Sequence, residues 1–523
     1  MNHLLTIDPT LIDWSRAQFA LTAIYHWLFV PLTLGLAVIM GIIETIYYRT
    51  GKPFWLEASK FWQRLFGVNF AMGVATGIIL EFEFGTNWSN YSWFVGDIFG
   101  APLAVEGIVA FFMESTFVAV MFFGWEKVSR GFHLASTWLT GIGATISAWW
   151  ILVANSWMQY PVGCEFNPDT VRNEMTSFAE VALSPMAIDK FFHTVISSWI
   201  VGAVFVCAVS CWYLLRGREQ QLARQSIKIA SIVGIVASLL AIHTGHSSAV
   251  KVAEVQPMKL AAMEGLYDGG NGVGLTMVAA ISPFSQPDYA KGGEAPLRIA
   301  MPGGLSMLAT STFDGYVPGV NDILNGYTRP DGKRELSAEE KMQRGRKAIT
   351  ALAEYRKLKA TDANDKRLPQ LASQLQKDMP YFGYGYIKDC AELVPYIPVN
   401  FYAFRVMVGV GMLLLLFFLV IGHVAWRQDI TKRGRWLWMA ALLMLPLAYI
   451  ASEAGWIVAE LGRQPWAIQD MLPTVAAVSD LKSGSVALTF FIFLVLFTLL
   501  LIAEIRIMCR VIKNYKPQIE SAD

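Results

Sequence analysis

Two carboxylates interrupt an apolar run that is long enough to cross a lipid bilayer. Glu106 and Glu114 lie within 103–125, directly after a turn at 96–102 that contains Gly, Asp and Pro. An ionised carboxylate in hydrocarbon is costly, so such acids usually face a partner, a cofactor or a water path. On a regular helix the two acids would lie about 80° apart around the axis and about 12 Å apart along it. This geometry suits proton delivery to a buried reaction centre, and the alternative is that neighbouring helices simply satisfy both acids.

Side chains that could bind a metal or a haem iron are few, so their positions are informative. Among seven histidines, His26 and His193 lie inside apolar runs. Met407 lies at a depth in its run similar to that of His193. A His/Met pair at one level could bind both faces of a haem and form a six-coordinate electron-transfer centre. Glu453 is a third carboxylate inside a run. Buried methionines also serve as packing residues, so position alone leaves these roles open.

Three arginines accompany these candidates. Arg405 lies two residues before Met407, Arg463 lies in the motif GRQPW, and Arg16 lies in SRAQF. A guanidinium group can hold a carboxylate such as a haem propionate through two parallel hydrogen bonds. Arg405 could instead extend its charged end to the membrane surface.

A strongly apolar chain carries these residues. Of 523 residues, 54% are hydrophobic and only 16% are charged, less charge than a soluble protein of this size carries. The net charge of +1 offers no basic surface for nucleic acid. We therefore expect an all-α polytopic membrane protein with nine transmembrane helices. The predicted spans are 17–46, 62–81, 102–125, 133–157, 188–215, 226–243, 400–426, 434–459 and 485–508.

Cysteine usage gives little further chemistry. The five cysteines include no CxxC pair, which argues against an iron–sulfur cluster or a zinc ribbon. Cys164 and Cys390 both fall on the predicted outer side, where a disulfide could form.

The distribution of Lys and Arg between loops predicts the orientation. Basic residues cluster in alternate short loops and in the tail, whereas the loop 82–101 contains none. The positive-inside rule then places the N-terminus in the periplasm and the C-terminus in the cytoplasm. In this topology the outer half of the membrane holds all the ligand-type residues: His26, Glu106, Glu453, His193 and Met407.

The chain divides into three parts on this prediction. Residues 1–243 contain transmembrane helices 1–6, and residues 400–523 contain helices 7–9 and a cytoplasmic tail. Between them, 244–399 is polar, rich in Gly and Pro, and external. Such long insertions usually have a function.

Six stretches are long enough to compare as motifs. They are SRAQFALTAIYHWLFVPLTLG, FGVNFAMGVATGIILEFEFGTNW, VGDIFGAPLAVEGIVAFFMEST, ILVANSWMQYP, FYAFRVM and EAGWIVAELGRQPWAI. Together they resemble subunit I of the cytochrome bd family of quinol oxidases. The external segment contains VQPMKLAAMEG near its start, which is similar to the opening of the family's quinol loop, and its length resembles the long-loop branch.

The resemblance implies three haem groups: a low-spin haem b, a high-spin haem b and a haem d. His193 and Met407 would bind the low-spin haem, as their depth already suggests. His26 and Glu453 would serve the high-spin pair, with Glu106 beside the oxygen-reactive iron. Members of the family differ in which high-spin haem occupies which pocket, so haem d is assigned to neither ligand.

The resemblance also implies an activity, which is oxidation of membrane quinol and reduction of dioxygen to water in the bacterial inner membrane, generating proton motive force without pumping. Lys259 and Glu264 match quinol-site positions. Glu114 matches the acid of the proton path, with Ser115 and Ser147 as hydroxyl partners. The implied partners are a second membrane subunit, subunit II, and a small single-helix accessory subunit.

Two other functions fit parts of the sequence. A haem-bearing electron-transfer subunit that oxidises quinol without oxygen chemistry would need only His193 and Met407, and it would leave His26, Glu106 and Glu453 without a role. A secondary transporter could use the buried acids as coupling sites, but transporters often show internal repeats and broken midplane helices. Neither feature is visible in this sequence.

Overall fold

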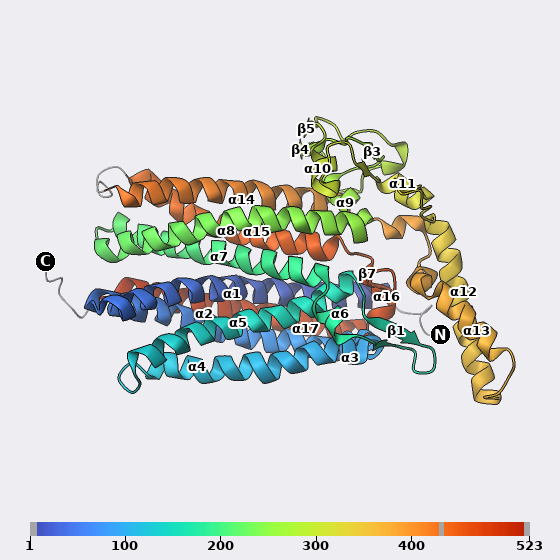
Figure 1. The fold of residues 1–523 in the computed structure, drawn as a ribbon, viewed down its shortest axis with the longest axis horizontal. Coiled ribbons are helices and arrows are strands. Elements are labelled where there is room, and N and C mark those ends of the chain that lie inside the picture. The colour runs from blue at the N-terminus through green and yellow to red at the C-terminus, as the bar shows by residue number, and fades with distance from the viewer. Residues whose placement is uncertain (1–7, 428–433, 517–523) are drawn as a thin grey trace.

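The computed structural model describes residues 8–427 and 434–516. Within these residues nine helical segments are long and apolar enough to cross a membrane, so the predicted all-α membrane architecture is confirmed. The long helices lie side by side in one elongated bundle (Figure 1). They are α1 (Pro9–Thr50), α2 (Pro53–Thr86), the run formed by α3 (Ser89–Val105), η2 (Glu106–Phe111) and α4 (Phe112–Phe123), α5 (Arg130–Gln159), α7 (Pro185–Leu215), α8 (Gln220–Val255), α14 (Ile397–Trp426), α15 (Arg435–Leu461) and α17 (Ser483–Asn514).

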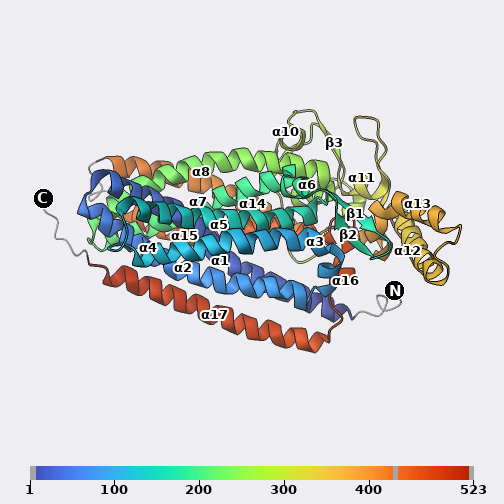
Figure 2. The same ribbon diagram turned by 60° about the horizontal axis from the view of Figure 1, so that its bottom comes forward.

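Most of these helices are longer than the apolar runs that predicted them. α8 continues to Val255 and α14 begins at Ile397, so helical structure reaches into the predicted segment 244–399 from both sides. The basic loop after the seventh span and the end of the tail lie at 428–433 and 517–523, outside the described residues. α17 packs on α1 and α2 along one side of the bundle (Figure 2).

The third span is not a regular helix. Gly96 has φ 42°, and a Cβ atom at this position would lie 1.7 Å from the guanidinium of Arg172. Pro102 lies inside α3, and from Glu106 the chain adopts a π-helix, a form that occurs frequently at functional sites. The predicted angle of about 80° between Glu106 and Glu114 assumed an unbroken α-helix and is therefore wrong.

The segment between α8 and α14 forms a cap at one end of the bundle, and α17 ends at the other (Figure 1). Ser337 and Glu340 form a capping box at the start of its longest helix, α12. The cap contains α9 (Pro257–Glu264), β3 (Gly270–Asn271), β4 (Leu275–Val278), η3 (Tyr289–Lys291), β5 (Ile299–Met301), α10 (Gly304–Thr310), β6 (Tyr316–Val317), α11 (Val320–Asn325), α12 (Ala338–Thr361), α13 (Leu368–Asp378), η4 (Met379–Tyr386) and η5 (Cys390–Leu393).

Short elements complete the same end of the bundle. The strands form antiparallel pairs, β1 with β2, β3 with β6, β4 with β5, and β7 with β8. Cys164 and Cys390 are free thiols, so the disulfide considered between them is not formed. The remaining elements are β1 (Cys164–Asn167), β2 (Arg172–Met175), α6 (Phe178–Ala182), β7 (Trp466–Ile468), β8 (Leu472–Pro473) and α16 (Thr474–Ala477).

The centre of the bundle depends on a close approach of α1 and α7. A Cβ atom at Gly202 would lie 2.5 Å from the backbone of Gly35, and a Cβ at Gly35 would lie 2.5 Å from the carbonyl oxygen of Ser198. Small residues at helix interfaces in membranes allow backbones to approach in this way.

Replacing Gly202 by Ala should therefore destabilise the bundle. We expect a loss of about 1–3 kcal/mol, because the added methyl group forces two backbones apart. Thermal unfolding of the detergent-solubilised protein measures the effect. The matched control is Gly411→Ala on α14, where nothing lies within 4 Å of the added atom. Equal unfolding temperatures for the two variants would contradict the packing argument.

Candidate functional site

His26 on α1 is held so that one ring nitrogen stays free. Its Nδ1 lies 3.0 Å from Oγ1 of Thr76 on α2. The Thr76 hydroxyl donates its own proton to the carbonyl of Met72, at 3.0 Å. Nδ1 must therefore be the donor, which leaves the lone pair of Nε2 available to a ligand. Histidines that bind metals characteristically donate their second ring N–H in this way.

His193 on α7 shows the same arrangement. Its Nδ1 lies 3.0 Å from Oγ1 of Thr244 on α8, and that hydroxyl donates to the carbonyl of Leu240 at 3.0 Å. No hydrogen bond to Nε2 of His193 or His26 occurs among the described residues. The two predicted iron ligands thus share one tautomer, with Nε2 free.

A glycine follows each of these threonines and faces the imidazole ring. A Cβ atom at Gly77 would lie 3.0 Å from Cε1 of His26, and one at Gly245 would lie 3.3 Å from Cε1 of His193. These Thr-Gly pairs were not predicted from the sequence. The repeated dipeptide one helix away from each histidine is the signal that could have found them.

Met407 on α14 lies against α15, the helix that carries Glu453. The sulfur of Met407 would be 3.1 Å from a Cβ atom at Gly455, so a side chain at this position would crowd the sulfur. Both carboxylate oxygens of Glu453 are buried and have no hydrogen-bond partner among the described residues. A buried carboxylate without a partner is expensive, which suggests that a ligand completes this site.

Contacts between helices bring these residues to one level. Trp27, next to His26, donates a hydrogen bond of 2.7 Å to Ser452, next to Glu453. Trp27 also packs edge-to-face on Trp456, with ring centroids 5.1 Å apart. His26, Glu453 and, through Gly455, Met407 therefore lie at similar depths in the bundle.

The acids of the third span face α5. Ser147 donates a hydrogen bond of 2.7 Å to Glu106. Trp149, two residues after Ser147, packs on Phe191 of α7 with ring centroids 4.9 Å apart. Phe191 lies two residues before His193, so Glu106 lies close to the level of His193. The structure thus brings all five ligand-type residues of the sequence analysis to one zone of the bundle.

Glu114 lies in the next part of the same interface. It is 6% exposed, and its Cγ would lie 2.7 Å from a Cβ atom at Gly143 of α5. The predicted hydroxyl partners lie elsewhere: Ser147 contacts Glu106, and the exposed Ser115 donates to the carbonyl of Phe112 at 3.2 Å.

Lys259 on α9 is buried in a polar network. Its Nζ donates to Gln159 at 2.7 Å and to Gln256 at 2.9 Å. Burial, together with the nearby Lys190, lowers the pKa of Lys259 well below its usual range. Arg463 lies close to Lys259. Its guanidinium group donates hydrogen bonds to Glu460 and to the backbone carbonyls of two residues in β7.

The polar residues that surround Lys259 were not predicted from the sequence. Asn155 donates to Glu460 at 3.0 Å and accepts from Lys190 at 2.8 Å. Asn155 and Gln159 lie one turn apart at the end of α5, and this spacing was the available signal.

Glu264 lies at the other end of α9 and faces a different environment. Glu264 follows Lys259 by five residues, which places the two side chains about 140° apart around the helix axis. One carboxylate oxygen accepts a hydrogen bond of 2.8 Å from Arg405, and the other has no partner among the described residues. Burial raises the pKa of Glu264 to about 7, against the lowering effect of Arg405. Glu264 lines a cavity of about 340 Å³ between α14 and the cap.

The three predicted propionate-binding arginines have different settings. Arg405 is held by Glu264 and by the carbonyls of Met263 and Thr276, at 2.6 and 2.7 Å. Arg463 is buried beside Glu460, whereas Arg16 is exposed on α1.

Comparisons with known proteins agree over almost the whole chain. Residues 14–516 match the family described as cytochrome bd terminal oxidase subunit I. The chain is 45% identical over 504 residues to the cytochrome bd-II ubiquinol oxidase subunit 1 of Escherichia coli (strain K12), covering 95% of each chain. It is 34% identical over 490 residues to the cytochrome bd ubiquinol oxidase subunit 1 of Bacillus subtilis (strain 168), covering 93% of this chain and 90% of that one. Its fold is similar to that of the bd oxidase from Geobacillus thermodenitrificans, with a TM-score of 0.77 at 22% identity, covering 97% of this chain and 99% of that chain.

The Glu264–Arg405 pair predicts a pH-dependent stability. Because its folded pKa of about 7 lies above the ordinary value of about 4.3, Glu264 costs stability as the pH rises through this interval. Arg405→Gln removes the main opposing charge, so the pKa should rise further and the loss should continue above pH 7. We expect the unfolding temperature of this variant to fall by several degrees more at pH 8 than at pH 6.

The control for this prediction is Arg334→Gln, which breaks an exposed pair with Glu340. Exposed pairs contribute little, so its unfolding temperature should match that of the unsubstituted protein at both values of pH. A loss of stability in Arg405→Gln that is the same at pH 6 and pH 8 would contradict the assignment.

Proposed function

This chain belongs to the cytochrome bd terminal oxidase subunit I family, and we infer from this membership that it oxidises membrane quinol and reduces dioxygen to water. The family implies haem cofactors, partner subunits and a place in the bacterial inner membrane. The observation in this chain that supports oxidase chemistry most directly is the shared setting of His26 and His193. Each keeps Nε2 free at one level of an apolar bundle.

The residues present fit haem groups. Low-spin haem b would be held by His193 and Met407, each of which faces a glycine. High-spin haem b and haem d would use His26 and Glu453, and Glu453 has both oxygens without a partner among the described residues. Bound haem supplies one-electron transfer and, at an open iron position, binding of dioxygen.

Arginines near these sites are suited to anionic groups. Arg463 has a buried Nε without a hydrogen-bond partner among the described residues, as does Arg405. Each arginine could donate this Nε–H to a propionate. A second hydrogen bond to the propionate would require the guanidinium group to give up one of its present contacts. Arg16, which is exposed on α1, could do so at the edge of the bundle.

Quinol oxidation is assigned to the cap side of the bundle. Glu264 lines the cavity, and one of its carboxylate oxygens has no hydrogen-bond partner among the described residues. With a pKa of about 7, it can accept a proton from quinol at neutral pH. Lys259 is buried on another face of α9 and can donate a hydrogen bond to a quinone oxygen only if it releases Gln159 or Gln256. Residues of the cap that follow Glu264 line its cavity.

Protons for water formation are assigned to the opposite, cytoplasmic side. Glu114 and then Glu106 would carry them toward the zone of His26 and Glu453, with the Ser147 hydroxyl bonded to Glu106. Quinol protons leave on the outer side while consumed protons come from the inner side. This separation generates proton motive force without a pump.

The assembled oxidase is proposed to contain subunit II and a small single-helix accessory subunit. Long helices of this chain keep apolar side chains exposed along their length, and these faces suit lipid or other membrane helices. On α17 they are Leu488, Phe491, Ile492, Val495 and Leu499.

Removal of either proposed ligand should abolish the low-spin haem signal. His193→Ala or Met407→Leu in the purified oxidase should lose this component from the reduced-minus-oxidised spectrum and lose quinol-dependent oxygen consumption. The control is His423→Ala, near the far end of α14 and away from the proposed sites. An unchanged spectrum in the two ligand variants would refute the pairing.

The quinol site is tested by steady-state kinetics. Glu264→Gln keeps the shape of the side chain but removes its ability to take a proton, so we expect kcat with quinol to fall by about tenfold or more. Lys259→Met should raise the KM for quinol. Kinetics with soluble quinols that match those of the unsubstituted oxidase would remove both residues from the site.

A further inference from the structure

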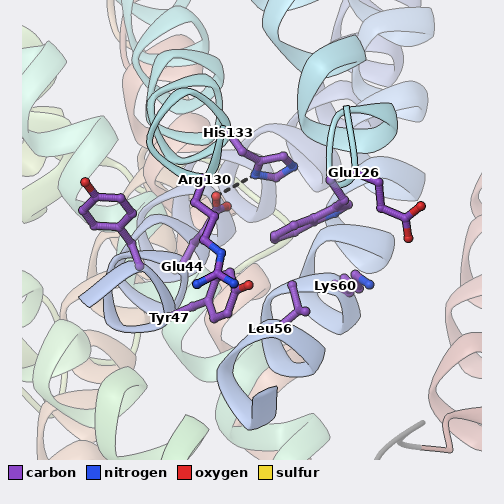
Figure 3. A pocket seen from close by; sticks show the side chains of 9 residues that line it. Glu44, Tyr47, Leu56, Lys60, Glu126, Arg130 and His133 are labelled. Atoms are coloured by element: carbon purple, nitrogen blue, oxygen red, sulfur yellow. Dashed lines mark hydrogen bonds and ion pairs between the residues drawn. The ribbon is translucent and has the colours of Figure 1, made fainter. Parts of the chain in front are cut away.

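A buried Glu–His pair lies at the end of the bundle opposite the cap, outside every site described above. Nδ1 of His133 on α5 is 2.6 Å from Oε1 of Glu44 on α1 (Figure 3). Glu44 is 1% exposed and His133 2%. The second carboxylate oxygen accepts from Thr137 at 2.5 Å and from Gln63 at 3.3 Å. The two carboxylate oxygens of Glu44 and Nδ1 of His133 thus each have a polar partner.

The hydrogen bonds of His133 fix how many protons the pair holds. Its Nε2 lies 3.0 Å from the backbone carbonyl of Met121, which can only accept, so Nε2 carries a proton. The bond between Nδ1 and Oε1 then contains one further proton, whichever atom carries it. This setting is the reverse of that of His26 and His193, whose Nε2 atoms are free. The pair is built to hold a proton rather than a metal.

A cavity connects the pair to the surface. It has a volume of about 190 Å³, enough for several waters. Glu44 and His133 form buried parts of its lining, and Glu126 and Arg130 form exposed parts (Figure 3). The remaining lining residues are Tyr47, Tyr48, Leu56, Lys60 and Trp125.

Hydroxyl groups on α5 continue inward from the pair. Thr137, Thr140 and Ser147 recur on one face of the helix, and both threonines are fully buried. Between Thr140 and Ser147, Gly143 allows Glu114 to approach the helix backbone. Ser147 then contacts Glu106. The stretch from 133 to 147 spans about 21 Å, and side chains three or four residues apart are close enough for one water to bridge them.

We propose that the Glu44–His133 pair is a proton-uptake site that takes protons from the cytoplasmic cavity and passes them along the hydroxyl face of α5 to Glu114 and Glu106. A proton arriving through the cavity replaces the one that leaves the Nδ1–Oε1 bond toward Thr137. The inference rests on the proposed oxidase function and on the predicted orientation. It places the uptake site within this chain, between α1, α2 and α5.

The test uses the purified oxidase with its partner subunits, in which Glu44 is replaced by Gln. Glutamine keeps the shape and the hydrogen bonds but cannot carry the proton. Mixing the fully reduced complex with oxygen in the presence of a pH-indicator dye should show proton uptake slowed by about tenfold or more. Reduction of haem by quinol without oxygen should keep its normal rate. A pair with only a structural role would alter unfolding temperature and leave the uptake rate unchanged.

Thr140→Val provides a second test that does not touch the pair. It removes one hydroxyl from the proposed path and should slow proton uptake several-fold, and it decides the question if Glu44→Gln does not assemble. The control matched to Glu44→Gln is Glu219→Gln. Glu219 precedes α8 at the same end of the bundle and does not line the cavity. Its uptake rate should be unchanged.

The outcomes separate this inference from the proposed function. Normal proton uptake in both Glu44→Gln and Thr140→Val, with oxygen consumption intact, would overturn the uptake site alone. Absence of quinol-dependent oxygen consumption in the unsubstituted complex would instead contradict the oxidase function.

Discussion

The cost of placing polar groups in an apolar bundle governs how this protein is organised. With no water in the bilayer core, each buried donor or acceptor needs a partner from another helix. Many polar side chains between the helices have one: Glu106 has Ser147, and Glu44 has His133. The exceptions are informative for this reason. Among the exceptions, both carboxylate oxygens of Glu453 have no partner among the described residues. The side-chain hydrogen bonds of His26 and His193 within the same residues involve only Nδ1. These three side chains lie in one zone of the bundle.

Small residues and indole rings bring that zone together. Gly77, Gly245 and Gly455 each leave space beside a proposed ligand, because a side chain there would meet the ring or the sulfur. Trp27 ties α1 to α15 at the same depth. The site is therefore a property of helix packing, and no single helix contains it. The close contact of Gly35 and Gly202 serves the same packing between α1 and α7.

The spans and the depth of their ligands could be predicted from sequence because each depends on one helix at a time. A run of apolar residues gives a span, and a rise of about 1.5 Å per residue gives the depth of His193 or Met407. Features that depend on neighbouring helices could not be predicted. Without knowing that α5 faces the third span, nothing assigns Ser147 to Glu106. The π-helical turn at Glu106 and the separate settings of Lys259 and Glu264 likewise arise from packing.

The central claim is that the free Nε2 atoms, Met407 and Glu453 surround cofactors near the cap end of the bundle. A density map of the purified, assembled oxidase tests it most directly. We expect tetrapyrrole density in contact with His193 and Met407 and with His26 and Glu453, in the half of the bundle that carries the cap. A map in which these side chains contact only protein or lipid, or in which the tetrapyrroles lie at the end near Glu44 and His133, would contradict it.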